Sequence, residues 1–372
     1  MMGWDLMTNH NTTISPMQFF VIAVNSMFGS SLLTLPSDLA RIAKEDMWMP
    51  MLFGSILIFV AFWVAVKLSA YFPDVTVIDY HVLLVGRIPG FILNVLMILL
   101  MMVIVGIFER NFTIAVKTYL LDLTPPQVIN IFTLGLAIYA IQYGLAPLLR
   151  LQQFLFAPEY GAFLTIILLG VLSIDANNYQ PMLAEGITPV LQGMIPTWFT
   201  YTGPEILIGF LFPFINPKKG VLKWGIFSIS VTACIYVMIT LIVQGILGPT
   251  ETTNTIVPTM MAYRYIEIPD TFIERLDGYL MTIWIVISFT SLINWLYFIA
   301  FGIGQMLKLE SSRPIVVLII PFIYYLLYVP PNAYAIQIIT QWVNFASLFW
   351  GLGITPLLLA LAWLKAKRKM PC

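Results

Sequence analysis

The sequence predicts an all-α integral membrane protein with about ten transmembrane helices, built as a single membrane domain over residues 1–372. Hydrophobic residues make up 60% of the chain and charged residues only 10%, against about 45–50% and 25% in soluble domains. The mean hydropathy is +0.91. Most apolar runs reach roughly 20 residues, which a helix needs to cross a bilayer. These runs are too long for barrel strands and lack their alternation of polar and apolar residues.

The composition also excludes several classes of function. Eighteen basic residues balance eighteen acidic ones, so no net field attracts nucleic acid, and no nucleic-acid partner is expected. The chain has two cysteines and two histidines, too few for a disulfide framework or a transition-metal site. We therefore expect no metal and no cofactor.

Ten apolar segments follow one another, and each is expected to form one span. Residues 1–14 contain no Lys or Arg, so no secretory signal peptide is expected before the first span. Pro330 and Pro331 end the ninth span, and a basic tail follows the tenth. The expected spans cover residues 15–40, 48–71, 89–114, 126–146, 150–173, 187–215, 221–247, 276–306, 314–329 and 334–364.

Two connecting segments have features of their own. Residues 74–87 mix apolar and polar side chains, which predicts a short amphipathic helix in the membrane interface. Residues 249–274 form a long loop between spans seven and eight, which is either a lid or a passive connector.

The basic residues predict that both termini are cytoplasmic. With this orientation twelve Lys and Arg residues lie inside and six lie outside, as the positive-inside rule requires. The inner set is Lys67, Arg87, Arg150, Lys218, Lys219, Lys223, Lys308, Arg313, Lys365, Lys367, Arg368 and Lys369, and the outer set is Arg41, Lys44, Arg110, Lys117, Arg264 and Arg275.

Two spans are expected to be broken near the middle of the membrane. Span one contains a glycine and three serines over residues 25–31. Span six contains Gly203 and Pro204 followed by Glu205, and Pro204 removes a helical donor. Non-helical backbone survives in the membrane only where it lines a cavity or is buried in protein. The two breaks therefore predict a binding site.

Breaks in spans one and six of ten are typical of a five-plus-five inverted repeat. The repeats would cover about residues 15–173 and 187–329, and residues 334–372 would add the last helix and the cytoplasmic tail. Free amides where span one resumes favour an anion, and free carbonyls near Tyr201 favour a cation. Together the breaks could hold the two charges of a zwitterion such as an amino acid.

Several polar side chains within spans are candidates for the site, and each has an alternative role. Glu205 is either a functional carboxylate or a cap for free amides, and Glu159 is either a proton site or an internal hydrogen-bond partner. Thr290, Ser291 and Asn294 could ligate a cation or join helices. The expected ligand-binding residues are Phe28, Gly29, Ser30, Ser31, Val105, Tyr201, Thr202, Gly203, Glu205, Thr290 and Asn294, and the possible proton or ion site comprises Glu159, Glu205, Thr290 and Ser291.

The chain resembles the B subunit of spore germinant receptors, a branch of the amino acid–polyamine–organocation superfamily with a LeuT-like fold. The resemblance covers nearly the whole length and rests on the order and spacing of several short motifs. These are Ile14, Ser15, Pro16 and Gln18, then Gly29 to Leu35-Pro36, then Glu185, Gly186, Ile187, Pro189 and the stretch from Gly193 to Pro196, then Glu274, Arg275, Leu276 and Asp277.

The resemblance implies a germinant-sensing subunit in the bacterial cell membrane or inner spore membrane that acts with A and C subunits. It places the pocket for the germinant, often an amino acid, between spans one, three, six and eight, around Gly29, Val105, Thr202, Gly203 and Thr290. An ion-coupled amino-acid permease is the alternative, because the fold fits both. A membrane-embedded enzyme is not expected, since no leaflet concentrates His, Asp and Glu.

Overall fold

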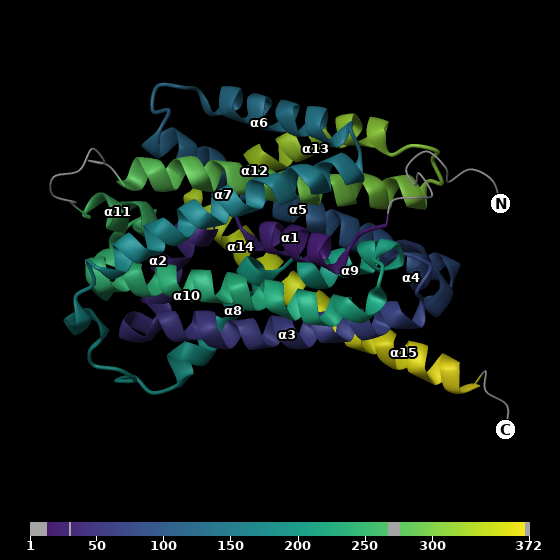
Figure 1. The fold of residues 1–372 in the computed structure, drawn as a ribbon, viewed down its shortest axis with the longest axis horizontal. Coiled ribbons are helices and arrows are strands. Elements are labelled where there is room, and N and C mark those ends of the chain that lie inside the picture. Colours follow the sequence, from purple (N-terminus) through teal and green to yellow (C-terminus); the bar gives the residue numbers. More distant parts are fainter. Residues whose placement is uncertain (1–12, 30, 267–275, 369–372) are drawn as a thin grey trace.

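The computed structural model describes residues 13–29, 31–266 and 276–368. This part of the chain consists of helices joined by turns and loops (Figure 1). The α-helices in chain order are α1 (Pro16–Met27), α2 (Ser31–Ala43), α3 (Trp48–Tyr71), α4 (Val77–Val85), α5 (Arg87–Tyr119), α6 (Pro126–Ile141), α7 (Leu145–Val171), α8 (Thr188–Tyr201), α9 (Pro204–Leu211), α10 (Val221–Asn254), α11 (Pro258–Arg264), α12 (Leu276–Met306), α13 (Arg313–Tyr328), α14 (Ala333–Phe349) and α15 (Thr355–Arg368).

The helices have the lengths and hydropathy of an integral membrane protein. Within the described ranges, six are long and apolar enough to cross a membrane, or seven if the bent pair α1 and α2 is one span. The helices α6 and α13 are apolar but shorter. The same ranges contain no β-strand, and Ile14 and Ile215 form only an isolated parallel bridge. The all-α membrane class predicted from composition is thus confirmed.

The first apolar segment is interrupted where the sequence predicts. It begins with a capping box, in which Ser15 and Gln18 each accept the other's backbone N–H, and Pro16 opens the helix. α1 ends at Met27, and Phe28 is extended, with φ −83° and ψ 121°. α2 then leaves at 56° to α1.

The sixth apolar segment is interrupted at the predicted Gly-Pro step. α8 ends at Tyr201, Thr202 is extended, and α9 begins at Pro204. Gly203 has φ +156°, a backbone conformation that residues with a Cβ atom disfavour. An added Cβ at Gly203 would also lie 2.6 Å from Ser26 Oγ of α1. The two interruptions are therefore in contact with each other.

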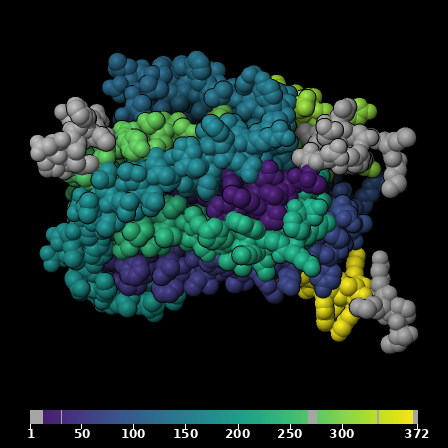
Figure 2. Space-filling model, viewed as in Figure 1, coloured from purple at the N-terminus to yellow at the C-terminus, as the bar shows by residue number. Residues whose placement is uncertain are grey.

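Most helices run along the long axis of the molecule, with α1 in its interior (Figure 1). α1 packs against α7, α10 and α12, and α3 packs against α8 and α10. The start of α1 and the end of α15 lie at the same end of the bundle, where α4 and α9 are also found. α15 projects from the body at that end (Figure 2).

Both distinctive connecting segments contain short helices. The predicted amphipathic helix is α4, and its residues Tyr80, His81 and Leu84 are buried. His81 Nδ1 lies 2.7 Å from Asn94 Oδ1 of α5, and Asn94 Nδ2 donates to the Ile78 carbonyl oxygen. The long loop contains α11, whose Thr259 hydroxyl donates to the Leu32 carbonyl oxygen of α2 at 2.8 Å. α11 thus packs on the second half of the first apolar segment.

The last apolar segment includes a π-helical turn at Trp350–Ile354, between α14 and α15. The Thr355 hydroxyl donates to the Trp350 carbonyl oxygen at 2.9 Å, across this wider turn. An added Cβ at Gly351 would lie 2.5 Å from the ring of Trp198 in α8. Glycine in the turn therefore lets this segment pack closely on α8.

Candidate functional site

A small buried cavity of about 30 Å³ lies where the two interruptions meet. Its walls come from the turn between α1 and α2, from α5, from the end of α8 and from α12. The lining residues are Ser26, Met27, Phe28, Gly29, Ser31, Ile104, Val105, Phe108, Phe199, Thr200, Thr202, Ser291, Leu292 and Trp295.

Aromatic and aliphatic side chains form one wall of this cavity. Phe28 is fully buried and packs against the rings of Tyr160, Phe163 and Tyr236. At Gly29 an added Cβ would lie 3.2 Å from two ring carbons of Phe108. A larger residue at position 29 would therefore displace Phe108, which itself lines the cavity.

The carbonyl oxygens at the end of α1 accept hydrogen bonds from neighbouring helices. Trp295 Nε1 of α12 donates to the Ser26 carbonyl oxygen at 3.2 Å, and Trp284 Nε1 donates to that of Gly29 at 3.1 Å. The Tyr236 hydroxyl of α10 donates to the Met27 carbonyl oxygen at 3.1 Å. These side chains provide the partners that the missing helical turn would have supplied.

Glu205 caps the helix in which it lies. Its Oε2 accepts the Gly203 backbone N–H at 3.0 Å, so the carboxylate satisfies an amide freed by the break. Of the two roles considered for Glu205, the structure gives it the capping contact, and Glu205 does not line the cavity. Thr202 remains hydrogen-bonded to α8, because its backbone N–H and its hydroxyl both donate to the Trp198 carbonyl oxygen at 3.0 Å.

Thr200 is a cavity residue that the sequence-based prediction missed. It is 2% exposed, and its Oγ1 is buried without a hydrogen-bond partner among the described residues. A buried hydroxyl without a partner costs about 1–3 kcal/mol, so a bound polar group at this point would be favoured. The signal for Thr200 was its place in the last turn of α8, beside the predicted break.

Two other predicted residues, Asn294 and Thr290, are buried outside the cavity lining. Asn25, Gln152 and Asn294 form one buried network, in which Gln152 Nε2 donates to Asn294 Oδ1 at 2.6 Å. The Tyr160 hydroxyl extends this network by donating to Asn25 Oδ1 at 3.0 Å. The Thr290 hydroxyl donates within its own helix to the Ile287 carbonyl oxygen.

The structure thus divides the predicted site residues into three groups. Phe28, Gly29, Ser31, Val105, Thr202 and Ser291 line the cavity. Glu159, Tyr201, Gly203, Glu205, Thr290 and Asn294 are buried but outside its lining. Ser30 lies outside the described residues.

Comparison with known proteins gives the family of this chain. The family model described as "Spore germination protein" matches residues 13–335, which is most of the sequence. The chain belongs to the spore germination protein family. Spore germination protein YndE of Bacillus subtilis (strain 168) is 29% identical over 357 residues, covering 95% of this chain and 97% of that protein. Spore germination protein A2 of the same organism is 28% identical, covering 90% and 92% of the two chains, and spore germination protein KB is 26% identical, covering 79% of each.

A buried carboxylate of this spore germination protein lies apart from the cavity lining. Glu159 of α7 is 5% exposed, and neither of its carboxylate oxygens has a hydrogen-bond partner in the described part of the chain. Its neighbour Tyr160 packs on Phe28 and donates to the polar network at Asn25. The described residues contain no group of three His, Cys, Asp or Glu side chains that could hold a metal ion.

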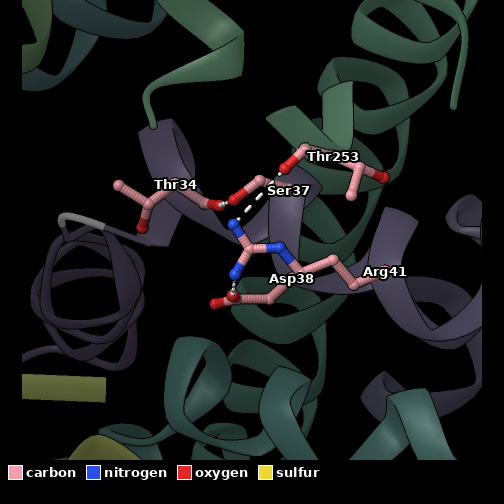
Figure 3. Close-up of polar contacts among 5 residues, drawn as sticks. All are labelled: Thr34, Ser37, Asp38, Arg41 and Thr253. Carbon is pink, nitrogen blue, oxygen red and sulfur yellow. Dashed lines mark hydrogen bonds and ion pairs between the residues drawn. The ribbon is translucent and has the colours of Figure 1, made fainter. Parts of the chain in front are cut away.

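A second polar cluster lies near the end of α2 (Figure 3). Arg41 Nη2 donates to the Thr253 carbonyl oxygen at 3.3 Å, and Arg41 Nη1 lies 3.8 Å from Asp38 Oδ1. The Ser37 hydroxyl donates to the Thr34 carbonyl oxygen at 2.9 Å. The contact between Arg41 and Thr253 joins α2 to the part of α10 that follows the kink at Gly248, and the other two contacts lie within α2.

An open hollow of about 360 Å³ adjoins this cluster, and Arg41 and Lys44 contribute its basic groups. Lys44 pairs with Glu185, and this hydrogen bond raises the pKa of Lys44. Both basic side chains thus have protein partners. The hollow offers less unsatisfied bonding capacity to a ligand than the cavity at the helix breaks.

Proposed function

We propose that this chain is the germinant-sensing subunit of a spore germination receptor. It binds a small polar ligand, an amino acid, in the cavity between the α1–α2 turn, α5, the end of α8 and α12. The observation that carries this proposal is the meeting of two helix breaks at one cavity, with the unpartnered Thr200 hydroxyl in its wall. The Thr200 hydroxyl suits a polar group of such a ligand, and the carbonyl oxygens of Ser26, Met27 and Gly29, which each accept one protein hydrogen bond, keep a second lone pair for an ammonium group.

The small volume of the cavity supports a sensing role. About 30 Å³ holds water but not an amino acid, so the ligand requires a wider form of the site. A ligand that binds only the wider form shifts the population toward it. Ligand binding then changes the conformation of the chain. The A and C subunits of the receptor are the proposed partners that respond to this change.

The proposed architecture has ten spans in a LeuT-like five-plus-five arrangement. α1 with α2, and α8 with α9, would each form one broken span, and the inverted repeats would cover about residues 15–173 and 187–329. The matched breaks support this arrangement, as does the shared position of the described chain ends. We place both termini in the cytoplasm and the protein in the inner spore membrane.

An ion-coupled amino-acid permease is the second candidate, and Glu159 favours it. A buried carboxylate without a partner near a proposed substrate site could exchange a proton during transport. The residues proposed for a proton or ion site remain Glu159, Glu205, Thr290 and Ser291.

Ligand-dependent thermal stability of the purified full chain tests the binding proposal. A subset of amino acids should raise the unfolding temperature, because a ligand at 100 times its Kd adds about 2.7 kcal/mol to the free energy of unfolding. Replacing Gly29 by Leu should abolish this increase. The absence of stabilisation by any amino acid at millimolar concentration would contradict the proposal.

Uptake into liposomes separates the two functions. A sensor should bind its amino acid without accumulating it, whereas a permease should concentrate it under a proton or sodium gradient. Uptake that is lost in Glu159→Gln would establish the permease. Binding without concentrative uptake would support the sensor.

A further inference from the structure

A second cavity, of about 190 Å³, lies between α5, α13 and α14. Its walls are apolar and include Val103, Ile107, Leu326 and Ile339. Arg110 is the one polar side chain among its described lining residues. An apolar cavity with a single guanidinium group suits an amphiphile that carries an anion at one end.

The guanidinium of Arg110 lacks a carboxylate partner in the described part of the chain. Its neighbour Glu109 is directed to α6, where the Thr133 hydroxyl donates to Glu109 Oε1 at 2.6 Å. Arg110 forms no ion pair with any described acidic residue, and its Nε is buried without a hydrogen-bond partner. A partly buried cation near lipid favours an anionic partner, and guanidinium binds phosphate through paired hydrogen bonds.

The aromatic ring beneath Arg110 is held in place by the protein. The Arg110 guanidinium lies 5.4 Å from the centre of the Tyr328 ring. Asn130 Nδ2 donates to the Tyr328 hydroxyl at 3.0 Å, and the Thr113 hydroxyl donates to Asn130 Oδ1. Stacking engages the face of a guanidinium and leaves its edge, which carries the N–H groups, available to an anion.

The position of Arg110 along α5 matches the depth of a lipid phosphate. α5 has 33 residues and is about 50 Å long, so a hydrocarbon core of about 30 Å leaves roughly 10 Å of helix on each side. Arg110 lies nine residues before the end of α5 at Tyr119, or about 13 Å, which is close to the hydrocarbon boundary. A long arginine side chain can reach the headgroup level from there.

The surroundings of the cavity favour a lipid over a water-soluble anion. The cavity adjoins the turn from α13 to α14, through Val329 and Pro330. On α14, Trp342 is 71% exposed and Phe345 is 52% exposed. Exposed aromatic side chains of this size on a membrane helix are suited to contact with acyl chains and the interface.

We propose that this cavity binds an acidic phospholipid. The lipid phosphate accepts hydrogen bonds from the edge of the Arg110 guanidinium, and the adjoining apolar part of the lipid occupies the walls formed by Ile107, Leu326 and Ile339. The site is separate from the cavity at the helix breaks, and it does not depend on the identity of the germinant.

Lipid titration of the purified full chain tests this proposal. The probes are dioctanoyl phosphatidylglycerol, glycerol phosphate and dioctanoylglycerol, and the measurements are thermal stability and lipid retention in native mass spectrometry. Phosphatidylglycerol should bind saturably, whereas the head group alone and the acyl chains alone should bind at least tenfold more weakly. Arg110→Gln should weaken phosphatidylglycerol binding about 10- to 100-fold, as expected from the loss of charge-assisted hydrogen bonds.

Two further variants keep the test decisive. Lys117→Gln removes a cation from the same end of α5 but outside the cavity, and it should leave binding unchanged. Ile339→Trp fills the cavity and keeps Arg110. It should weaken binding as well, and it tests the proposal even if Arg110→Gln does not fold. Equal binding to the parent, Arg110→Gln and Ile339→Trp would overturn the proposal, as would equal binding of glycerol phosphate and phosphatidylglycerol.

Discussion

Gly29 controls the volume of the cavity at the scale of a single residue. Its backbone lies so close to Phe108 that a leucine at this position has to displace the ring. We expect Gly29→Leu to cost about 1–3 kcal/mol in the ligand-bound form and to abolish the germinant response. Membrane abundance should stay normal. The germination response to amino acids and an immunoblot of the membrane fraction measure the two effects.

Gly161→Leu is the matched control for this prediction. No atom lies within 4 Å of an added Cβ at Gly161, so leucine there has space. The control should respond normally. A normal response in Gly29→Leu as well would show that the α1–α2 turn does not contact the ligand.

Thr200 should affect stability and response in opposite directions. Thr200→Val removes a buried hydroxyl without a partner, so the ligand-free protein should be more stable by about 1 kcal/mol. The same change removes a group offered to the ligand, so the response should need about tenfold more ligand. Thermal unfolding without ligand and a dose–response curve give the two values.

Thr202→Val provides the comparison, because the Thr202 hydroxyl already donates to the Trp198 carbonyl oxygen. This variant should gain no stability. If Thr200→Val responds to ligand like the parent, the Thr200 hydroxyl is not part of the binding site.

The sequence identified the glycines of the site more readily than its hydrogen-bonding side chains. Gly29 and Gly203 were predictable because glycine or a Gly-Pro step interrupts a helix locally. The donors Trp284, Trp295 and Tyr236 were not, because they reach α1 from helices more than 200 residues away. Thr200 could be found only from its place in the last turn before the Gly-Pro step, because threonine is also common in membrane helices as a packing residue.

At the scale of helices, the capping contact of Glu205 holds the start of α9. Glu205→Ala leaves the Gly203 N–H without this acceptor and should lower the free energy of unfolding by about 1 kcal/mol. Glu205→Gln keeps an acceptor oxygen and should retain most of the stability. Thermal unfolding of both variants checks this. An equal loss in both would show that the charge of Glu205 matters more than its hydrogen bond.

The attachment of α4 to α5 should depend on pH through His81. Burial lowers the pKa of His81 to about 4, below its usual value of about 6.5. The unfolded chain then binds a proton that the folded chain does not, so stability rises with pH between about 4 and 6.5. The purified protein should lose up to about 3 kcal/mol on acidification through this range.

His81→Gln removes this titration and can retain a hydrogen bond to Asn94. Its unfolding temperature should fall less steeply between pH 6.5 and 4 than that of the parent. Identical pH profiles of the two proteins would show that protonation of His81 does not control the stability of this region.

The positions of the long helices followed from apolar length, whereas the irregular turns did not. The expected segment 334–364 contains the π-helical turn at Trp350–Ile354, and no local rule placed it there. That turn packs against Trp198, and such a tertiary contact leaves no periodic pattern in the sequence. α10 also continues past the kink at Gly248, beyond the end expected from its apolar run.

At the scale of the whole molecule, the distribution of charge predicts which end of the bundle faces the cytoplasm. In a cysteine-free background, Leu123→Cys should react with a membrane-impermeant maleimide in intact cells, because Leu123 is 93% exposed in a loop expected outside. Lys219→Cys should react only after the membrane is opened. The reverse pattern would invert the proposed topology.

The contact between Ser26 and Gly203 has a consequence for the way the two halves of the chain move. No spare volume separates these residues, although they lie 177 positions apart in the sequence. A ligand that displaces the turn between α1 and α2 must therefore also displace the turn between α8 and α9. The two helix breaks therefore respond together to such a disturbance, in addition to the packing of α1 on α10 and α12.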